Sequence, residues 1–113
     1  MGAVTITTQL ANEFNTSSRR ATLLLTLPAS YDAGGSVLDL SALTGGGFTK
    51  VYGVDLIGQP TAASDRYHPT YIPAALYAPA TGLLKVRDLQ AAADAEASGD
   101  LSAVTMLVEV IGI

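Results

Sequence analysis

The chain has 113 residues, 49% of them hydrophobic, and no cysteine, which suits one domain held by packing without disulfides or a zinc ribbon. The net charge of -4 and the six scattered basic residues exclude a typical nucleic-acid binder. Only 14% of residues are charged, so we expect part of the apolar surface to meet a partner.

The N-terminal segment 3–10 alternates apolar residues with threonines, as in Val4, Thr5, Ile6 and Thr7. A period of two is typical of a half-buried β-strand. Residues 1–18 leave two interpretations open, a core strand or an extended arm that reaches a neighbouring molecule.

The next segments continue the strand pattern. Leu23, Leu25 and Leu27 share one face of a strand that Pro28 ends, because proline has no amide hydrogen for the ladder. Further along, Tyr52, Val54 and Leu56 are predicted on a core face. Gly53 indicates a bulge or a close backbone approach in that strand.

Three of the five tyrosines, Tyr67, Tyr71 and Tyr77, gather in one segment that Pro69 and Pro73 interrupt. Proline confines this segment to a sheet edge. Exposed tyrosines are enriched in protein interfaces because they combine a large apolar ring with one polar group.

Seven short strands in close succession predict an all-β fold, an antiparallel β-sandwich or small jelly roll that forms a single domain over 1–113. The predicted strands are 3–10, 20–27, 36–43, 48–57, 67–77, 83–87 and 104–111. The alanine-rich segment 88–98 departs from this pattern and predicts a short helix, with a loop as the alternative.

Residues suited to catalysis or metal binding are scarce. His68 is the single histidine, and there is no cysteine, so no histidine-rich metal site can form. Asp55 and Glu109 lie inside predicted strands, and we interpret them as solvent or interface positions rather than as a glycosidase pair. We therefore predict a protein that is not an enzyme, with no catalytic residues, no cofactor and no metal.

An internal similarity joins two segments, since residues 39–44 match residues 100–105 in type. Coincidence is one interpretation. The other is a pair of equivalent turns in which an Asp or Ser side chain bonds nearby backbone groups.

Several short motifs follow one another between Val37 and Gly112. They are Lys50-Val51-Tyr52-Gly53-Val54, an aromatic stretch, Gly82-Leu83-Leu84-Lys85-Val86 and Gly99-Asp100-Leu101-Ser102 followed by an apolar strand. This order of segments resembles a group of small phage virion proteins. The alanine-rich insert 90–97 departs from the pattern. The resemblance implies a capsid decoration (cement) protein that forms trimers or dimers and bridges neighbouring capsid subunits.

These arguments predict partners and a location. The expected partners are the major capsid protein and the chain itself, as a homotrimer first and a homodimer second, with no nucleic acid and no membrane. The protein would be made in the host cytoplasm and reside on the capsid exterior. The alternatives are a carbohydrate-binding or host-attachment module and an intracellular domain of unassigned role. The candidate interface residues are Val4, Ile6, Arg19, Arg20, Tyr67, His68, Tyr71 and Tyr77.

Overall fold

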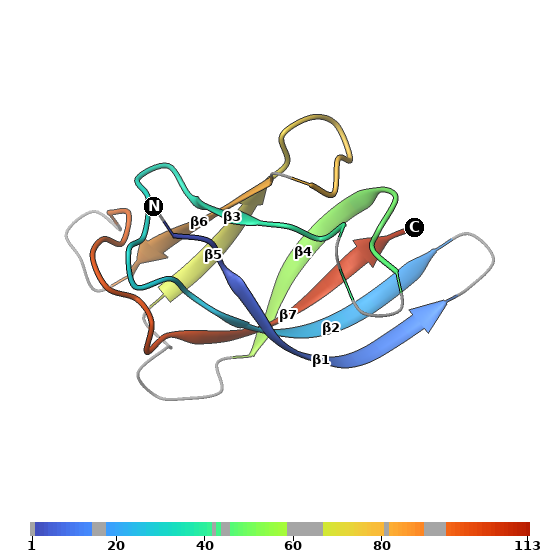
Figure 1. Cartoon of the computed structure of the whole chain (residues 1–113), viewed down its shortest axis with the longest axis horizontal. Helices are drawn as coiled ribbons and strands as arrows, with labels where there is room; N and C mark the ends of the chain where they lie inside the picture. The colour runs from blue at the N-terminus through green and yellow to red at the C-terminus, as the bar shows by residue number, and fades with distance from the viewer. Residues whose placement is uncertain are drawn as a thin grey trace.

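The computed structural model of the chain describes residues 2–14, 18–41, 43, 46–58, 67–80, 82–89 and 95–113. Within these ranges it is an all-β protein of seven strands in two antiparallel sheets (Figure 1). The strands are β1 (Thr5–Phe14), β2 (Arg19–Thr26), β3 (Ser36–Leu38), β4 (Val51–Gly58), β5 (Tyr67–Ile72), β6 (Gly82–Asp88) and β7 (Thr105–Gly112).

The two sheets form a β-sandwich. The larger sheet has the strand order β1-β2-β7-β4, and the smaller has the order β3-β6-β5. The C-terminal strand β7 therefore lies at the centre of the larger sheet, between β2 and β4, so the larger sheet is complete only when the last strand of the chain is in place.

The core fills the space between the sheets, and the alternation seen in the sequence explains it. Inward residues of the central strands β2, β7 and β6 are fully buried, and their outward neighbours are not. Each buried leucine or valine side chain contributes about 1.5–3 kcal/mol relative to exposure. The fully buried aliphatic side chains of these strands are Leu23, Leu25, Met106, Val108, Val110, Leu84 and Val86.

Two turns of the same design follow β3 and precede β7. Asp39 Oδ1 accepts hydrogen bonds from the Ser41 amide and hydroxyl, and Asp100 Oδ1 accepts the same pair from Ser102. The residue between each pair is buried, with Leu40 0% and Leu101 2% exposed. The similarity between 39–44 and 100–105 is thus a structural equivalence over its first three residues.

A hydrogen-bonded group around Tyr31 ties the end of the small sheet together. The Tyr31 hydroxyl donates to Glu96 Oε2 at 2.6 Å and accepts from the Val86 amide at 2.9 Å. The same Glu96 oxygen accepts from the Gly34 amide at 2.7 Å. Burial and the bond to Glu96 raise the pKa of Tyr31 well above its ordinary value.

The two sides of the sandwich differ. On one side the N-terminal segment joins the sheets, because Ala3 forms a parallel bridge with Val37 of β3 and the Val4 amide donates to the Val37 carbonyl at 2.8 Å. On the other side, β4 and β5 are the outer strands of different sheets and are not paired with each other. We call the bridged side the tied side, and the side where β4 and β5 form no ladder the open side (Figure 1).

The expected helix over 88–98 is wrong for the part that the structure describes. Asp88 ends β6, and residues 95–97 run beside β6, with hydrogen bonds from the Asp88 amide to Ala95 and from the Ala97 amide to Val86. Residues 90–94 lie outside the described residues. Alanine is the strongest helix former, but a short helix is marginal by itself, and pairing with β6 outweighs the preference.

Candidate interaction surface

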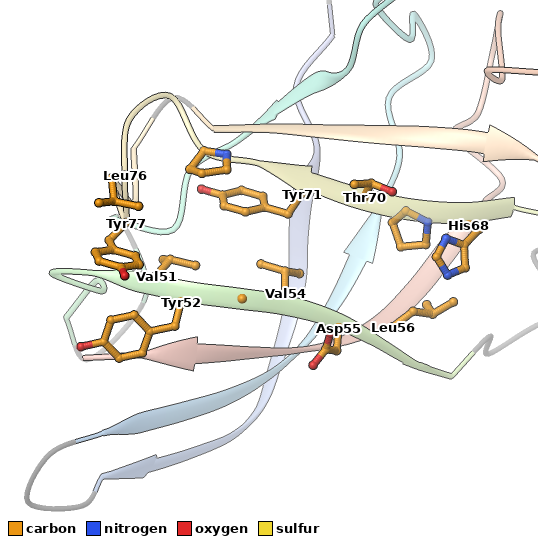
Figure 2. Close-up of a pocket in the computed structure, with 13 residues that line it drawn as sticks. Val51, Tyr52, Val54, Asp55, Leu56, His68, Thr70, Tyr71, Leu76 and Tyr77 are labelled. Carbon is orange, nitrogen blue, oxygen red and sulfur yellow. The ribbon is translucent and has the colours of Figure 1, made fainter.

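A groove of about 640 Å³ lies at the open side of the sandwich. Its walls are residues 51–56 of β4 and 68–71 of β5, and the connection that follows β5 closes one end with Pro73, Leu76 and Tyr77 (Figure 2). Both walls are outer strands, so no strand lies between them, and each has one edge without a paired strand that faces the groove.

A bulge in β4 decides which of its side chains face the groove. The pairing of β4 with β7 shifts register between Val51 and Gly53, so Tyr52 is the additional residue. Val51 and Val54 point towards β5, whereas Tyr52 and Asp55 point away from it (Figure 2). The prediction of a bulge near Gly53 is confirmed. The prediction of Tyr52 on the core face is wrong, since the side chain is 50% exposed.

Tyr71 occupies the interior of the groove between β5 and β4 (Figure 2). Its ring packs against the core, and its hydroxyl donates to the Ala78 carbonyl at 3.4 Å. Burial, with a smaller contribution from the carboxylate of Asp39, raises the pKa of Tyr71. A Cβ atom at Gly82 would overlap the Tyr71 hydroxyl and ring, so the glycine makes room for this position.

The connection after β5 is held against β4. The Tyr77 carbonyl accepts from the Val51 amide at 2.8 Å, and Tyr77 adopts φ 64°, an uncommon value for a residue with a side chain. The Tyr77 and Tyr52 rings meet edge to face, with centroids 5.3 Å apart and planes at 86°. Leu76 beside them is 81% exposed. The result is an exposed aromatic and aliphatic cluster at one end of the groove.

Polar residues lie towards the other end of the groove, where the Asp55 side chain points away from β5 (Figure 2). Asp55 and His68 are exposed. Asp55 is paired across the strands with Glu109 of β7, and Arg20 approaches Glu109 at 3.6 Å. Like charges on directly opposite residues repel, and Arg20 offsets part of that repulsion from the outer face of the larger sheet.

The sequence-predicted interface residues fall into separate regions. His68, Tyr71 and Tyr77 come together at the groove, while Tyr67 packs against the core from the start of β5. On the larger sheet, Arg20 is exposed. The remaining three lie elsewhere. Val4 and Ile6 are at the tied side, and the Arg19 side chain is buried in the fold.

Arg19 is 4% exposed, and its guanidinium lies over the Phe48 ring at 4.4 Å. Burial lowers the pKa of this guanidinium. Arg19 therefore contributes to the packing of the chain through a cation–π contact.

Sequence reasoning missed Tyr52 and Leu76 as groove residues. A strict period of two placed Tyr52 inside, and the signal that contradicts it is Gly53, which marks the bulge. Leu76 follows two alanines in a connection, and nothing in its neighbours distinguishes an exposed leucine from a buried one.

No match to this chain was found among protein-family models, curated proteins or solved structures. In the part of the chain that the structure describes, no cluster of three or more histidine, aspartate or glutamate side chains is arranged to hold a metal ion. The same residues include no helix of the length and apolarity needed to cross a bilayer.

Proposed function

We propose that this chain is a capsid decoration (cement) protein of a bacteriophage, which binds the outside of the shell and bridges neighbouring major capsid subunits. The observation that carries the proposal is the groove between two outer strands, with exposed aromatic and aliphatic side chains at one end. Exposed apolar patches with aromatic side chains are typical of sites where proteins contact each other.

The exposure of this end of the groove supports a docking role. Three large apolar side chains are exposed there, at 50% for Tyr52, 81% for Leu76 and 42% for Tyr77. Burying apolar area contributes about 25 cal/mol per Å². Central aromatic residues ringed by polar ones are the usual binding hot spots in protein interfaces.

The bridging role follows from the mechanics of a shell. A shell under internal pressure fails where capsid subunits separate, and a protein seated across that seam must detach before they part. About 800 Å² per partner suffices for a specific contact, and the many copies on one shell multiply a modest affinity.

The experiment compares the temperature of genome release for particles of the phage that encodes the chain, with and without the protein. We expect release at a higher temperature when the protein is bound. Leu76→Ala should weaken the free energy of binding to particles by about 1–2 kcal/mol. The control is Leu89→Ala, which changes an exposed leucine outside the groove and should leave binding unchanged. Equal release temperatures, or failure to bind particles, would contradict the proposal.

A second candidate function is carbohydrate binding, favoured by the combination of tyrosines with His68 and Thr70 along one groove. Aromatic rings stack on sugars, and the polar side chains can bond hydroxyl groups. Calorimetry with a set of polysaccharides tests it. Binding that Tyr52→Ala abolishes, together with no attachment to particles, would replace the capsid proposal.

A further inference from the structure

The outer face of the small sheet carries an ordered pattern, and its β5 positions His68 and Thr70 also border the groove. Alternation along β3, β5 and β6 turns seven side chains outward, and the strand register arranges them in three rows. The rows are Val37–Leu83–Ile72, Lys85–Thr70 and Arg87–His68.

The first row is apolar across all three strands. Val37 and Ile72 are 38% and 42% exposed. Val37 and Leu83 also line a hollow of about 360 Å³, together with Gly2, Ala3 and their neighbours. The hollow is large enough to accept an apolar side chain from a partner, so this end of the face has a defined place for an anchor.

The other two rows are basic. Lys85, Arg87 and His68 lie on adjacent strands of a chain whose net charge is -4. None of the three takes part in an ion pair within the described residues. The seven outward positions contain no acid, so this face differs in sign from the molecule as a whole.

Among the described residues outside the three strands, two acids lie beside this face. Glu96 forms a backbone bridge with Arg87, but its carboxylate accepts hydrogen bonds from the Tyr31 hydroxyl and the Gly34 amide. Asp32 lines the hollow, on the apolar side of the pattern. A negatively charged partner is therefore attracted towards Lys85 and Arg87 and repelled from the Asp32 end, which gives the bound segment one orientation.

We propose that this face binds an acidic segment of a partner protein, which inserts an apolar side chain into the hollow and lays carboxylates over Lys85 and Arg87. The charge pattern and the apolar row together favour a protein over a nucleic acid, because a phosphate backbone gains nothing from the row Val37–Leu83–Ile72. The inference is independent of the capsid proposal and holds for any partner of this chemistry.

The area of the face sets the strength of the contact. Three strands about 4.8 Å apart and five residues at about 3.3 Å each cover on the order of 250 Å². This is well below the roughly 800 Å² per partner of a stable interface. A single segment therefore binds weakly, and tight association requires a second contact or many copies.

The test is an NMR titration of the folded chain with a short synthetic peptide of alternating glutamate and leucine. We expect the amide resonances of β5 and β6 to shift. Lys85→Glu should weaken binding about tenfold, equivalent to about 1.4 kcal/mol. Lys50→Glu, the same charge change at an exposed lysine outside the small sheet, should have little effect. A peptide with glutamine in place of glutamate should bind more weakly.

Several outcomes would overturn the inference. One is equal weakening by Lys85→Glu and Lys50→Glu, which would reduce the effect to net charge. Another is a set of shifted amides that lies outside the small sheet, or no shift at millimolar peptide. A short DNA duplex that shifts the same amides more strongly than the peptide would assign the face to nucleic acid instead.

Discussion

Tyr31 joins three segments through one hydroxyl, which bonds both Glu96 and the Val86 amide. Tyr31→Phe leaves a buried amide without its acceptor, so we expect the free energy of unfolding to fall by about 1–3 kcal/mol. Urea unfolding monitored by circular dichroism measures it. Tyr52→Phe, at a half-exposed tyrosine, is the control, and an equal effect of both changes would contradict the role of Tyr31.

The raised pKa of Tyr31 predicts a loss of stability in alkali. Below about pH 10 the phenol is protonated in both states. Above that value the unfolded chain loses the proton while the folded protein retains it, because burial and Glu96 oppose ionisation, so unfolding becomes easier as pH rises. Urea titrations from about pH 8 to 11 should show a shallower decline in Tyr31→Phe than in the parent. Identical slopes would contradict the prediction.

Gly82 and Tyr71 form a pair in which the small residue admits the large one. A methyl group at Gly82 would overlap the Tyr71 ring, so Gly82→Ala should cost about 1–3 kcal/mol of stability and displace Tyr71. Thermal unfolding and the ring resonances of Tyr71 report both effects. Gly53→Ala is the matched control, because a Cβ atom there meets nothing within 4 Å. Equal effects of both changes would show that Tyr71 is not confined by Gly82.

At the scale of elements, the sequence predicts the strands whose faces alternate strictly, such as β2 and β7. It fails where a tertiary contact outweighs a local preference. β3 ends at Leu38 rather than near residue 43, because the Asp39 carboxylate bonds Ser41 and turns the chain. Pairing with β6 overrides helix propensity at residues 95–97. The groove forms because β4 and β5 are the outer strands of their sheets. The sequence of a single strand does not indicate its place in a sheet, so the groove could not be predicted.

β1 forms part of the larger sheet, and deleting it tests whether the fold depends on it. It pairs along β2, and Val4 before it is 8% exposed and bonds to Val37. Deletion of residues 2–10 should therefore abolish the cooperative thermal transition, because the core loses a side chain and β2 loses its neighbour. A truncated protein that still unfolds cooperatively but no longer binds particles would instead identify residues 1–18 as an arm.

At the scale of the whole molecule, the exposed cluster at the groove predicts self-association, as a trimer first and a dimer second. Closed symmetry would bury apolar surface that one chain leaves in water. Light scattering coupled to gel filtration at tens of micromolar measures the mass. A monomeric mass would contradict an oligomer that forms before binding to the capsid. Assembly on the capsid is tested by the genome-release experiment described above.

The asymmetry between the tied and the open side has a dynamic consequence. Ala3 and Val37 form a backbone bridge on the tied side, whereas β4 and β5 form no ladder and are linked at one end by the hydrogen bond from the Val51 amide to the Tyr77 carbonyl. We therefore expect the width of the groove around Tyr71 to vary most at the end away from this hydrogen bond. A partner that fits only the narrow state selects it from the ensemble, and by thermodynamic linkage the occupied protein also resists unfolding.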